Sequence, residues 1–317
     1  MPILNVLRAA LAWLGRQGTR ALAASIFIGL AVPPLASYVK PYLGETVFVL
    51  LLFSYLRTDP HAFRRYVRAP AIVIAAALWV MIALPLIFGT VYVLSGVRDY
   101  MPALYTILIL QIAIAPITSS AAFAALMGLD VALSLTTLIA ASAISPVTTV
   151  AFSYLFLGTS LFSPIELGLK LFFFFASSGA VAYAIRRIAG QGWIERQKEP
   201  IDGLNVIGVF IFAIAAMDGV PRHFMEAPLF SFALLGLVVA VTVLLVAVTV
   251  LAFLRAGIRS GLVIGFAAAF RNLGLVMAAI GATLPDIAWF YFALAQFPIY
   301  LMPALVTPLA RRLAEKR

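Results

Sequence analysis

Long apolar stretches recur from one end of the chain to the other, and they limit what it can fold into. Runs of 18 or more apolar residues are long enough to cross a hydrocarbon core about 30 Å thick. Only 11% of the residues are charged and 64% are hydrophobic, whereas a soluble domain carries about 25% charged residues. We therefore predict an all-α polytopic membrane protein whose surroundings are the lipid bilayer. A water-soluble enzyme and a nucleic-acid-binding protein are excluded, despite a net charge of +10.

The apolar stretches divide into ten predicted transmembrane spans, five in each half of the chain. The first half holds residues 21–39, 43–56, 70–94, 102–126 and 131–157, and the second half holds residues 165–185, 204–217, 228–254, 262–284 and 287–309. The second span of each half is shorter than the other spans. Because five is an odd number, the two halves enter the membrane from opposite sides, which is the arrangement of an inverted-topology repeat.

The predicted domains follow from these halves. Residues 21–158 form the first inverted repeat, and residues 159–312 form the second. Residues 1–20 are predicted to be an interfacial amphipathic segment. A cleavable signal peptide is the alternative, but no convincing small-residue cleavage site precedes Ala21. Residues 313–317 form a cytoplasmic tail.

The positive charges are distributed unequally between the two sides of the predicted spans. Of the 22 Lys and Arg residues, 17 lie on the side that holds both termini, four lie on the other side, and Arg271 lies inside a span. Loops rich in Lys and Arg stay in the cytoplasm. Both termini are therefore predicted to be cytoplasmic.

The fourth span of the first half is interrupted near its middle by Ala-Pro-Ile-Thr-Ser-Ser, residues 115–120. Pro116 removes a backbone donor, and its ring clashes with the preceding turn of the helix. The hydroxyls of Thr118, Ser119 and Ser120 are suited to bond the freed backbone groups or a solute. We predict a helix break at this point.

The fourth span of the second half carries Arg271 and Asn272 in the middle of an apolar run. A charge at bilayer depth costs about 2.5–3.5 kcal/mol on insertion scales. Arg271 therefore requires a polar partner, a water-filled cavity or a bound anion. We predict a second break at residues 270–274, with Gly274 as its flexible point.

Interruptions in matching spans of two repeats indicate a transporter binding site. A Pro-kinked helix with Ser and Thr back-bonding, plus an arginine paired to a neighbour, is the alternative. Hydroxyls of the fifth span, such as Ser134, Thr137 and Ser145, either line the site or serve as packing residues. The residues predicted to bind substrate or ion are Gln111, Thr118, Ser119, Ser120, Ser134, Arg271 and Asn272.

Two short motifs accompany the breaks. The first is Leu-Met-Gly-Leu-Asp-Val-Ala-Leu-Ser, residues 126–134, with Ser145 and Pro146 downstream, and the second is Arg-Asn-Leu-Gly-Leu, residues 271–275. Together with the ten-span layout, these motifs resemble the bile acid:sodium symporter family. The resemblance implies a core domain and a panel domain that alternate access, two crossed discontinuous helices in the core, and organic anions as substrates.

The chain departs from that family at the sodium-binding positions. At the second break the family has a glutamate four residues before a Gln-Asn pair, and here these positions are Ala267, Arg271 and Asn272. At the first break the family has Thr-x-Ser-Asn, and residues 118–121 end in alanine instead. In the following span a sodium-binding Ser is kept, but the family's Thr corresponds to Leu138.

These replacements remove a carboxylate and several neutral oxygen ligands, and they place a cation in the former ligand shell. Two like unit charges about 4 Å apart repel by about 4 kcal/mol at an effective dielectric constant near 20. The resemblance therefore implies a secondary transporter for a small organic anion or amphipathic carboxylate, without sodium at the usual family sites. A sodium-coupled carrier with a rearranged site is the alternative.

Two roles are predicted for Arg271. Its guanidinium either occupies the former sodium volume as a tethered cation, or grips a carboxylate or phosphate of the substrate. Asp218, near an outer loop, is the strongest candidate for a proton relay, and facilitated diffusion or anion exchange is the alternative to proton coupling. The chain contains no cysteine, and its sequence reveals no grouping of nucleophile, base or metal ligands. We therefore expect no enzyme, cofactor or metal centre, with a channel as the remaining alternative class.

Overall fold

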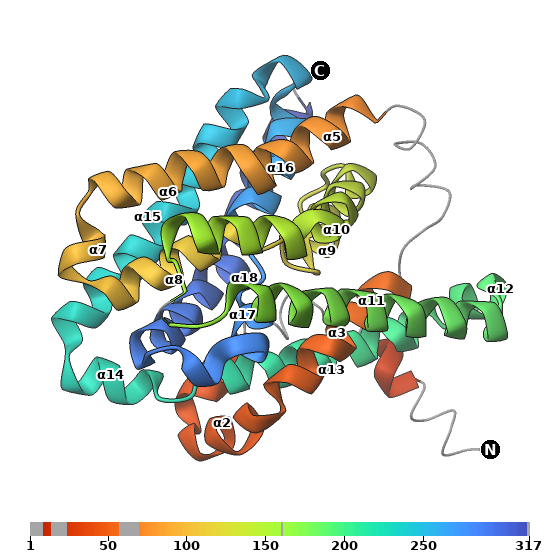
Figure 1. The fold of residues 1–317 in the computed structure, drawn as a ribbon. Helices are drawn as coiled ribbons and strands as arrows, with labels where there is room; N and C mark the ends of the chain where they lie inside the picture. Colours follow the sequence, from red (N-terminus) through yellow and green to blue (C-terminus); the bar gives the residue numbers. More distant parts are fainter. Residues whose placement is uncertain (1–8, 14–23, 57–69, 160, 316–317) are drawn as a thin grey trace. The chain divides into compact units, whose positions relative to one another are not determined.

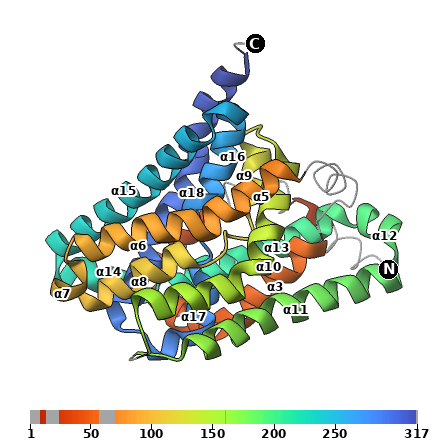
Figure 2. The same cartoon turned by 45° about the horizontal axis from the view of Figure 1, so that its top comes forward.

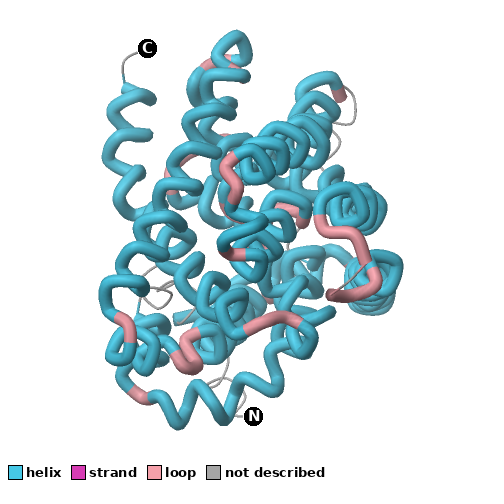
Figure 3. The backbone as a smooth tube through the Cα atoms, turned by 60° about the vertical axis from the view of Figure 1, so that its left-hand side comes forward, coloured by secondary structure: helices cyan, strands magenta, loops and turns pink. Residues whose placement is uncertain are grey.

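A computed structural model describes residues 9–13, 24–56, 70–159 and 161–315, without the side chains of residues 126 and 303–315. Most of the predicted interfacial segment 1–20 and the last two residues of the predicted tail 313–317 lie outside these ranges. The described elements are helices joined by short loops (Figure 3), apart from one isolated β-bridge. The predicted all-α class is confirmed for this part of the chain.

Several helices are long and apolar enough to cross a membrane. Among the described residues there are six, namely Pro33–Leu56, Ala71–Leu94, Val131–Phe156, Pro164–Ala189, Lys198–Glu226 and Pro228–Ala252. Shorter apolar helices run over Pro102–Ala113, Ile258–Ala269 and Leu273–Thr283. This composition is that of a multi-pass membrane protein.

The chain folds into two compact units, and each unit takes sequence from both halves. The first unit comprises residues 1–58 and 173–228, and the second comprises residues 59–172 and 229–317. Helix α11 (Pro164–Ala189) begins in the sequence of the second unit and ends in that of the first.

The first unit is built along helix α13 (Lys198–Ala216). Gly29 lies against Met217 near one end of α13, and Leu56 packs with Ile201 near the other end. Between these points the chain passes through α2 (Pro33–Val39), the 3₁₀ turn η1 (Lys40–Tyr42) and α3 (Leu43–Leu56), which together form one apolar helix of 24 residues. The unit also holds α12 (Gln191–Arg196) and α14 (Val220–Glu226).

Helix α13 corrects one prediction. The second span of the second half was expected to be short, at residues 204–217, whereas α13 is 19 residues long and begins at Lys198. Its first turns carry Lys198, Glu199 and Asp202. Hydropathy identifies only the apolar part of a helix, so it does not predict a first turn that is polar. In the first half, α3 has the predicted 14 residues, but it continues α2 and η1 in a single apolar helix of 24 residues, Pro33–Leu56.

The second unit contains both predicted breaks. Its first long rod consists of α5 (Ala71–Leu78), η2 (Trp79–Ala83) and α6 (Leu84–Leu94), drawn in orange in Figure 1. The remaining elements are α7 (Val97–Tyr100), α8 (Pro102–Ala113), α9 (Ser120–Leu126), α10 (Val131–Phe156), α15 (Pro228–Ala252), η3 (Leu254–Ala256), α16 (Ile258–Ala269), α17 (Leu273–Ile280), η4 (Gly281–Thr283) and α18 (Asp286–Glu315).

Small residues bring α16 close to α15 (Figure 2). A Cβ atom built on Gly261 would lie 3.2 Å from the Cα of Val250, and one on Gly265 would lie 3.2 Å from the carbonyl oxygen of Val246. Gly and other small residues allow helix backbones to approach in membranes. The spacing of four residues puts both glycines on the same face of α16.

Candidate functional site

The two predicted helix breaks are present, and they pair with each other. Helix α8 ends at Ala113 and α9 begins at Ser120, while α16 ends at Ala269 and α17 begins at Leu273. Pro116 and Arg271 form an isolated antiparallel bridge. All of these residues belong to the second unit.

Two backbone hydrogen bonds close this bridge. The N–H of Ile117 donates to the carbonyl of Phe270 at 2.8 Å, and the N–H of Asn272 donates to the carbonyl of Ala115 at 2.9 Å. Backbone groups that would otherwise be orphaned inside an apolar protein thus satisfy each other, as buried backbone must.

Helix α10 braces the first break with two hydroxyls. The Oγ of Ser145 accepts a hydrogen bond from the N–H of Ala115 at 3.1 Å. The hydroxyl of Thr149 donates to the carbonyl of Ala113 at 2.9 Å, and the two hydroxyls lie 3.3 Å apart. These contacts replace the helical bonds that Pro116 prevents.

Asn272, rather than Gly274, shapes the second break. Phe270 leaves the helical conformation at φ −89° and ψ 89°, and the side-chain oxygen of Asn272 caps α17 by accepting from the N–H of Leu275 at 3.3 Å. Gly274 lies inside α17 and has no positive φ. The prediction that Gly274 is the flexible point is therefore wrong, because the capping asparagine already ends the break.

Arg271 is buried at the centre of this arrangement, with only 2% of its surface exposed. Its Nε donates to the carbonyl of Ala268 at 2.6 Å, and its Nη1 donates to the carbonyl of Ile114 at 2.9 Å. Its Nη2 donates to the carbonyl of Val80 at 2.8 Å, and Nη1 also lies 3.7 Å from the sulfur of Met81. The guanidinium thus joins the ends of α16 and α8 to η2.

No carboxylate lies within ion-pair distance of Arg271 among the described residues. The acidic residues whose side chains the structure describes in the second unit are exposed and lie near helix ends: Asp99, Asp130, Glu166 and Asp286. The positive charge is therefore balanced by carbonyl dipoles and not by an opposite charge. This is the ligand chemistry that proteins use for bound cations.

The other predicted site residues are placed differently. Thr118 and Ser119 are half-buried in the first break, and Ser120 is the buried first residue of α9. Gln111 is buried in α8, where its side-chain oxygen accepts a hydrogen bond from the hydroxyl of Tyr291. Ser134 is 1% exposed on α10.

The structure brings together only part of the predicted set. The residues of the two breaks meet at the bridge, whereas Ser134 lies about 16 Å along α10 from Ser145, at 1.5 Å per residue. Ser134 is thus separate from the bridge. Sequence reasoning missed Val80, Met81 and Tyr291. Proline at position 85 was the signal that could have directed attention to the first two.

Asp218 lies in the first unit and is already engaged. It accepts a hydrogen bond from Ser37 at 2.6 Å and forms an ion pair with Lys40 at 2.9 Å. These contacts join the turn after α13 to α2 and η1. The pairing gives Asp218 a structural role, without requiring that it relay protons.

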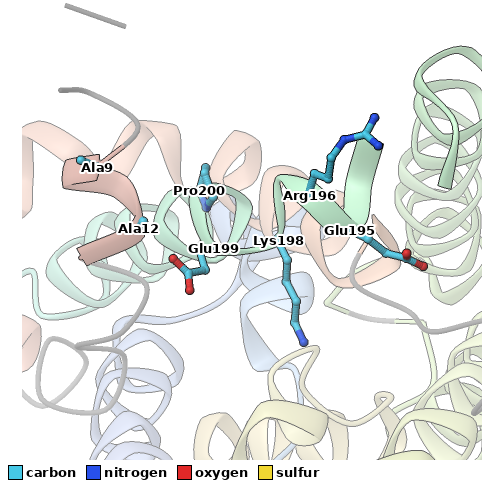
Figure 4. Close-up of a pocket in the computed structure, with 7 residues that line it drawn as sticks. All are labelled: Ala9, Ala12, Glu195, Arg196, Lys198, Glu199 and Pro200. Atoms are coloured by element: carbon cyan, nitrogen blue, oxygen red, sulfur yellow. The ribbon is translucent and has the colours of Figure 1, made fainter. Parts of the chain in front are cut away.

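A hollow of about 570 Å³ opens in the first unit near the start of α13. Its charged lining residues are Glu195, Arg196, Lys198 and Glu199, and their side chains point in different directions (Figure 4). Such a lining does not converge on one ligand. In the described part of the chain, no group of three His, Asp or Glu residues is placed to hold a metal ion.

The comparisons with known proteins assign no family to this chain. No protein-family model matches the chain, and no curated protein matches it. The resemblance to the bile acid:sodium symporters therefore stays a prediction from the two short motifs and the predicted span layout.

Proposed function

We propose that this protein is a secondary transporter that carries a small organic anion or amphipathic carboxylate across the bacterial inner membrane by alternating access. Arg271 serves it as a tethered cation that holds the two breaks together without sodium. The observation that carries the proposal is the guanidinium itself. It is buried, bound by three backbone carbonyls, and placed where two interrupted helices meet.

The proposed topology has ten spans in two inverted repeats, with both termini in the cytoplasm. The six long apolar helices and the two interrupted ones support this topology. Within residues 24–56 the structure describes one helix long enough to cross, Pro33–Leu56, where the proposed topology has two spans. Two compact units that each draw on both halves are also expected of a carrier with a core and a panel domain.

The tether is favoured over a direct grip on the substrate. Nε, Nη1 and Nη2 of Arg271 each already donate to a backbone carbonyl. A bidentate grip on a carboxylate needs two parallel N–H groups that are free to turn toward the ligand. A side chain that is 2% exposed and bound from three directions serves the protein better as a structural cation.

Thermal unfolding of Arg271→Ala without any substrate separates these two roles. The variant leaves three buried carbonyls without a donor, and each unbonded carbonyl lowers the free energy of unfolding by about 1–3 kcal/mol. We therefore expect its Tm to fall by on the order of 5–10 °C. Arg255→Ala is the control, because Arg255 is exposed in the same unit. An unchanged Tm for Arg271→Ala would exclude the tether and favour the direct grip.

A sodium-coupled carrier with a rearranged site is the second candidate. It is favoured by the buried hydroxyls of Ser120 and Thr137, which lack a hydrogen-bond partner. Hydroxyl oxygens of this kind are suitable ligands for a hard cation.

Uptake into proteoliposomes decides between the two candidates. A thermal-shift screen of carboxylates first identifies a stabilising anion, which is then used in radiolabelled form. With an inward sodium gradient, or with choline in place of sodium, we expect equal initial rates. A clear dependence on the sodium gradient would overturn the sodium-free version, and no uptake of any stabilising anion would overturn transport itself.

A further inference from the structure

The long rod α5–η2–α6 contains one turn of π-helix at its centre. In η2 the N–H of Leu84 bonds the carbonyl of Trp79, five residues back instead of four. Single π turns inside α-helices are rare overall, and those that occur often lie at functional sites. Val80 and Met81 of this turn are both 0% exposed, whereas Ile82 is 37% exposed.

The π turn leaves the carbonyl of Val80 without a partner inside its own helix. In α-helical register that carbonyl would accept from Leu84, but the N–H of Leu84 is bonded to Trp79. In π register it would accept from residue 85, which is a proline and has no N–H. Both helical donors are therefore removed at the same point.

A buried carbonyl in a membrane protein requires a donor, because no bulk water reaches it. The Nη2 of Arg271 supplies that donor at 2.8 Å. The neighbouring Met81 contributes its sulfur to Nη1 at 3.7 Å. The Val80 carbonyl, which has no donor in its own helix, is thus hydrogen-bonded to the Arg271 guanidinium, which has no carboxylate partner among the described residues.

A second contact holds the π turn in place. The indole N–H of Trp79 donates to the hydroxyl of Thr249 on α15 at 3.1 Å. The ring of Trp79 also packs edge-on against Phe253, with centroids 6.2 Å apart. The first residue of the π turn is therefore fixed to α15 while Val80 faces the guanidinium.

We propose that Pro85 is the positioning residue of Arg271, since it keeps the carbonyl of Val80 free for the guanidinium. Together with Ile114 and Ala268, Val80 completes a carbonyl cage whose ligand is a guanidinium. The inference goes beyond the proposed function and does not depend on transport, because it concerns how the cage is built.

The sign of the effect of Pro85→Ala tests this role directly. If Pro85 were only a defect inside a helix, its replacement by alanine would restore a helical bond and raise the Tm. We expect the Tm to fall instead, because the new N–H of residue 85 competes with Arg271 for the Val80 carbonyl. Pro102→Ala, at the first position of α8 where no carbonyl is freed, is the control and leaves the Tm unchanged.

A ligand readout separates positioning from a general structural role. In Arg271→Ala, methylguanidinium chloride at millimolar concentration should raise the Tm by refilling the cage, whereas choline chloride should not. In Pro85→Ala/Arg271→Ala the same shift should need at least about tenfold more methylguanidinium. Pro102→Ala/Arg271→Ala should respond as Arg271→Ala does.

Two results would overturn the proposal. One is a raised Tm for Pro85→Ala, and the other is an equal methylguanidinium response with and without Pro85. If Arg271→Ala does not accumulate, the sign of the Pro85→Ala shift decides alone. Neither readout measures uptake, so a failure here is distinguishable from a failure of the transport proposal.

Discussion

Arg271 keeps its charge inside the protein with the help of backbone dipoles alone. Two helix ends and one π turn direct their carbonyls at it, and each of the three is left unbonded by its own helix for a local reason. Arginine suits this task because its planar guanidinium presents several donors in fixed directions, whereas lysine is a compact point charge. The sequence predicted that the charge needed a partner, but it could not show that the partner was a set of carbonyls.

The hydroxyl of Ser145 has a defined task at the residue scale. It is the acceptor for the buried N–H of Ala115, beside Pro116. Ser145→Ala leaves that N–H unbonded, so we expect the free energy of unfolding to fall by about 1–3 kcal/mol. The measurement is thermal unfolding of the purified variant.

Thr148→Val is the matched control for Ser145→Ala. Thr148 follows on the same helix, but its hydroxyl bonds only the carbonyls of Ile144 and Ser145 within that helix. Its replacement should change stability by no more than about 0.5 kcal/mol. Equal effects of the two substitutions would show that the hydrogen bond from Ala115 to Ser145 does not contribute to stability.

At the scale of elements, the breaks could be predicted and the π turn could not. Pro116 with the hydroxyls that follow it marks an interruption, and α8 and α9 separate at that place. Pro85 lies in an equally apolar span, yet the rod continues through it. A proline in the sequence shows only that one backbone donor is missing. Tertiary packing decides whether the helix breaks, kinks or takes an extra residue into one turn.

The approach of α16 to α15 makes a second prediction at this scale. Gly265→Leu places a side chain where a Cβ alone would lie 3.2 Å from the carbonyl oxygen of Val246. Overpacking of this kind costs about 1–3 kcal/mol. Since α16 leads directly into the second break, we expect both a lower Tm and slower uptake.

Gly236→Leu is the control for the Gly265 substitution. Gly236 lies on α15, and no atom comes within 4 Å of a Cβ built on it. We expect it to leave the Tm and the uptake rate unchanged. If the two leucine variants behaved alike, close packing at Gly265 would not be what holds α16 in place.

At the scale of the whole molecule, the sequence did not predict which spans belong to which of the two units. Apolar periodicity finds the buried face of a helix in water, but in a bilayer the lipid-facing and protein-facing sides are both apolar. The sequence therefore placed α5, α10 and α15 well, without revealing which helices pack together. The division into units that each combine both halves emerges only from the contacts.

The proposed topology is testable without preparing a cysteine-free background, because the chain has no cysteine. Tyr100 is 86% exposed in α7, and Ile188 is 87% exposed near the end of α11. In intact inner-membrane vesicles of native orientation, an impermeant maleimide should label Tyr100→Cys, which lies on the predicted outer side. Ile188→Cys should react only after the membrane is made permeable, and the reverse pattern would invert the topology.

The carbonyl cage has a further consequence for energetics. A ligand joined to the chain has an effective concentration at its site that dilution of the medium does not change. A dissociable cation would empty the site when it became scarce, and in leaving and returning it would transmit the free energy of its gradient to the cargo. Arg271 does neither. The breaks are joined without a dissociable ion. In the proposed carrier, the direction of net movement is therefore left to the concentration difference of the anion and to the membrane potential that acts on its charge.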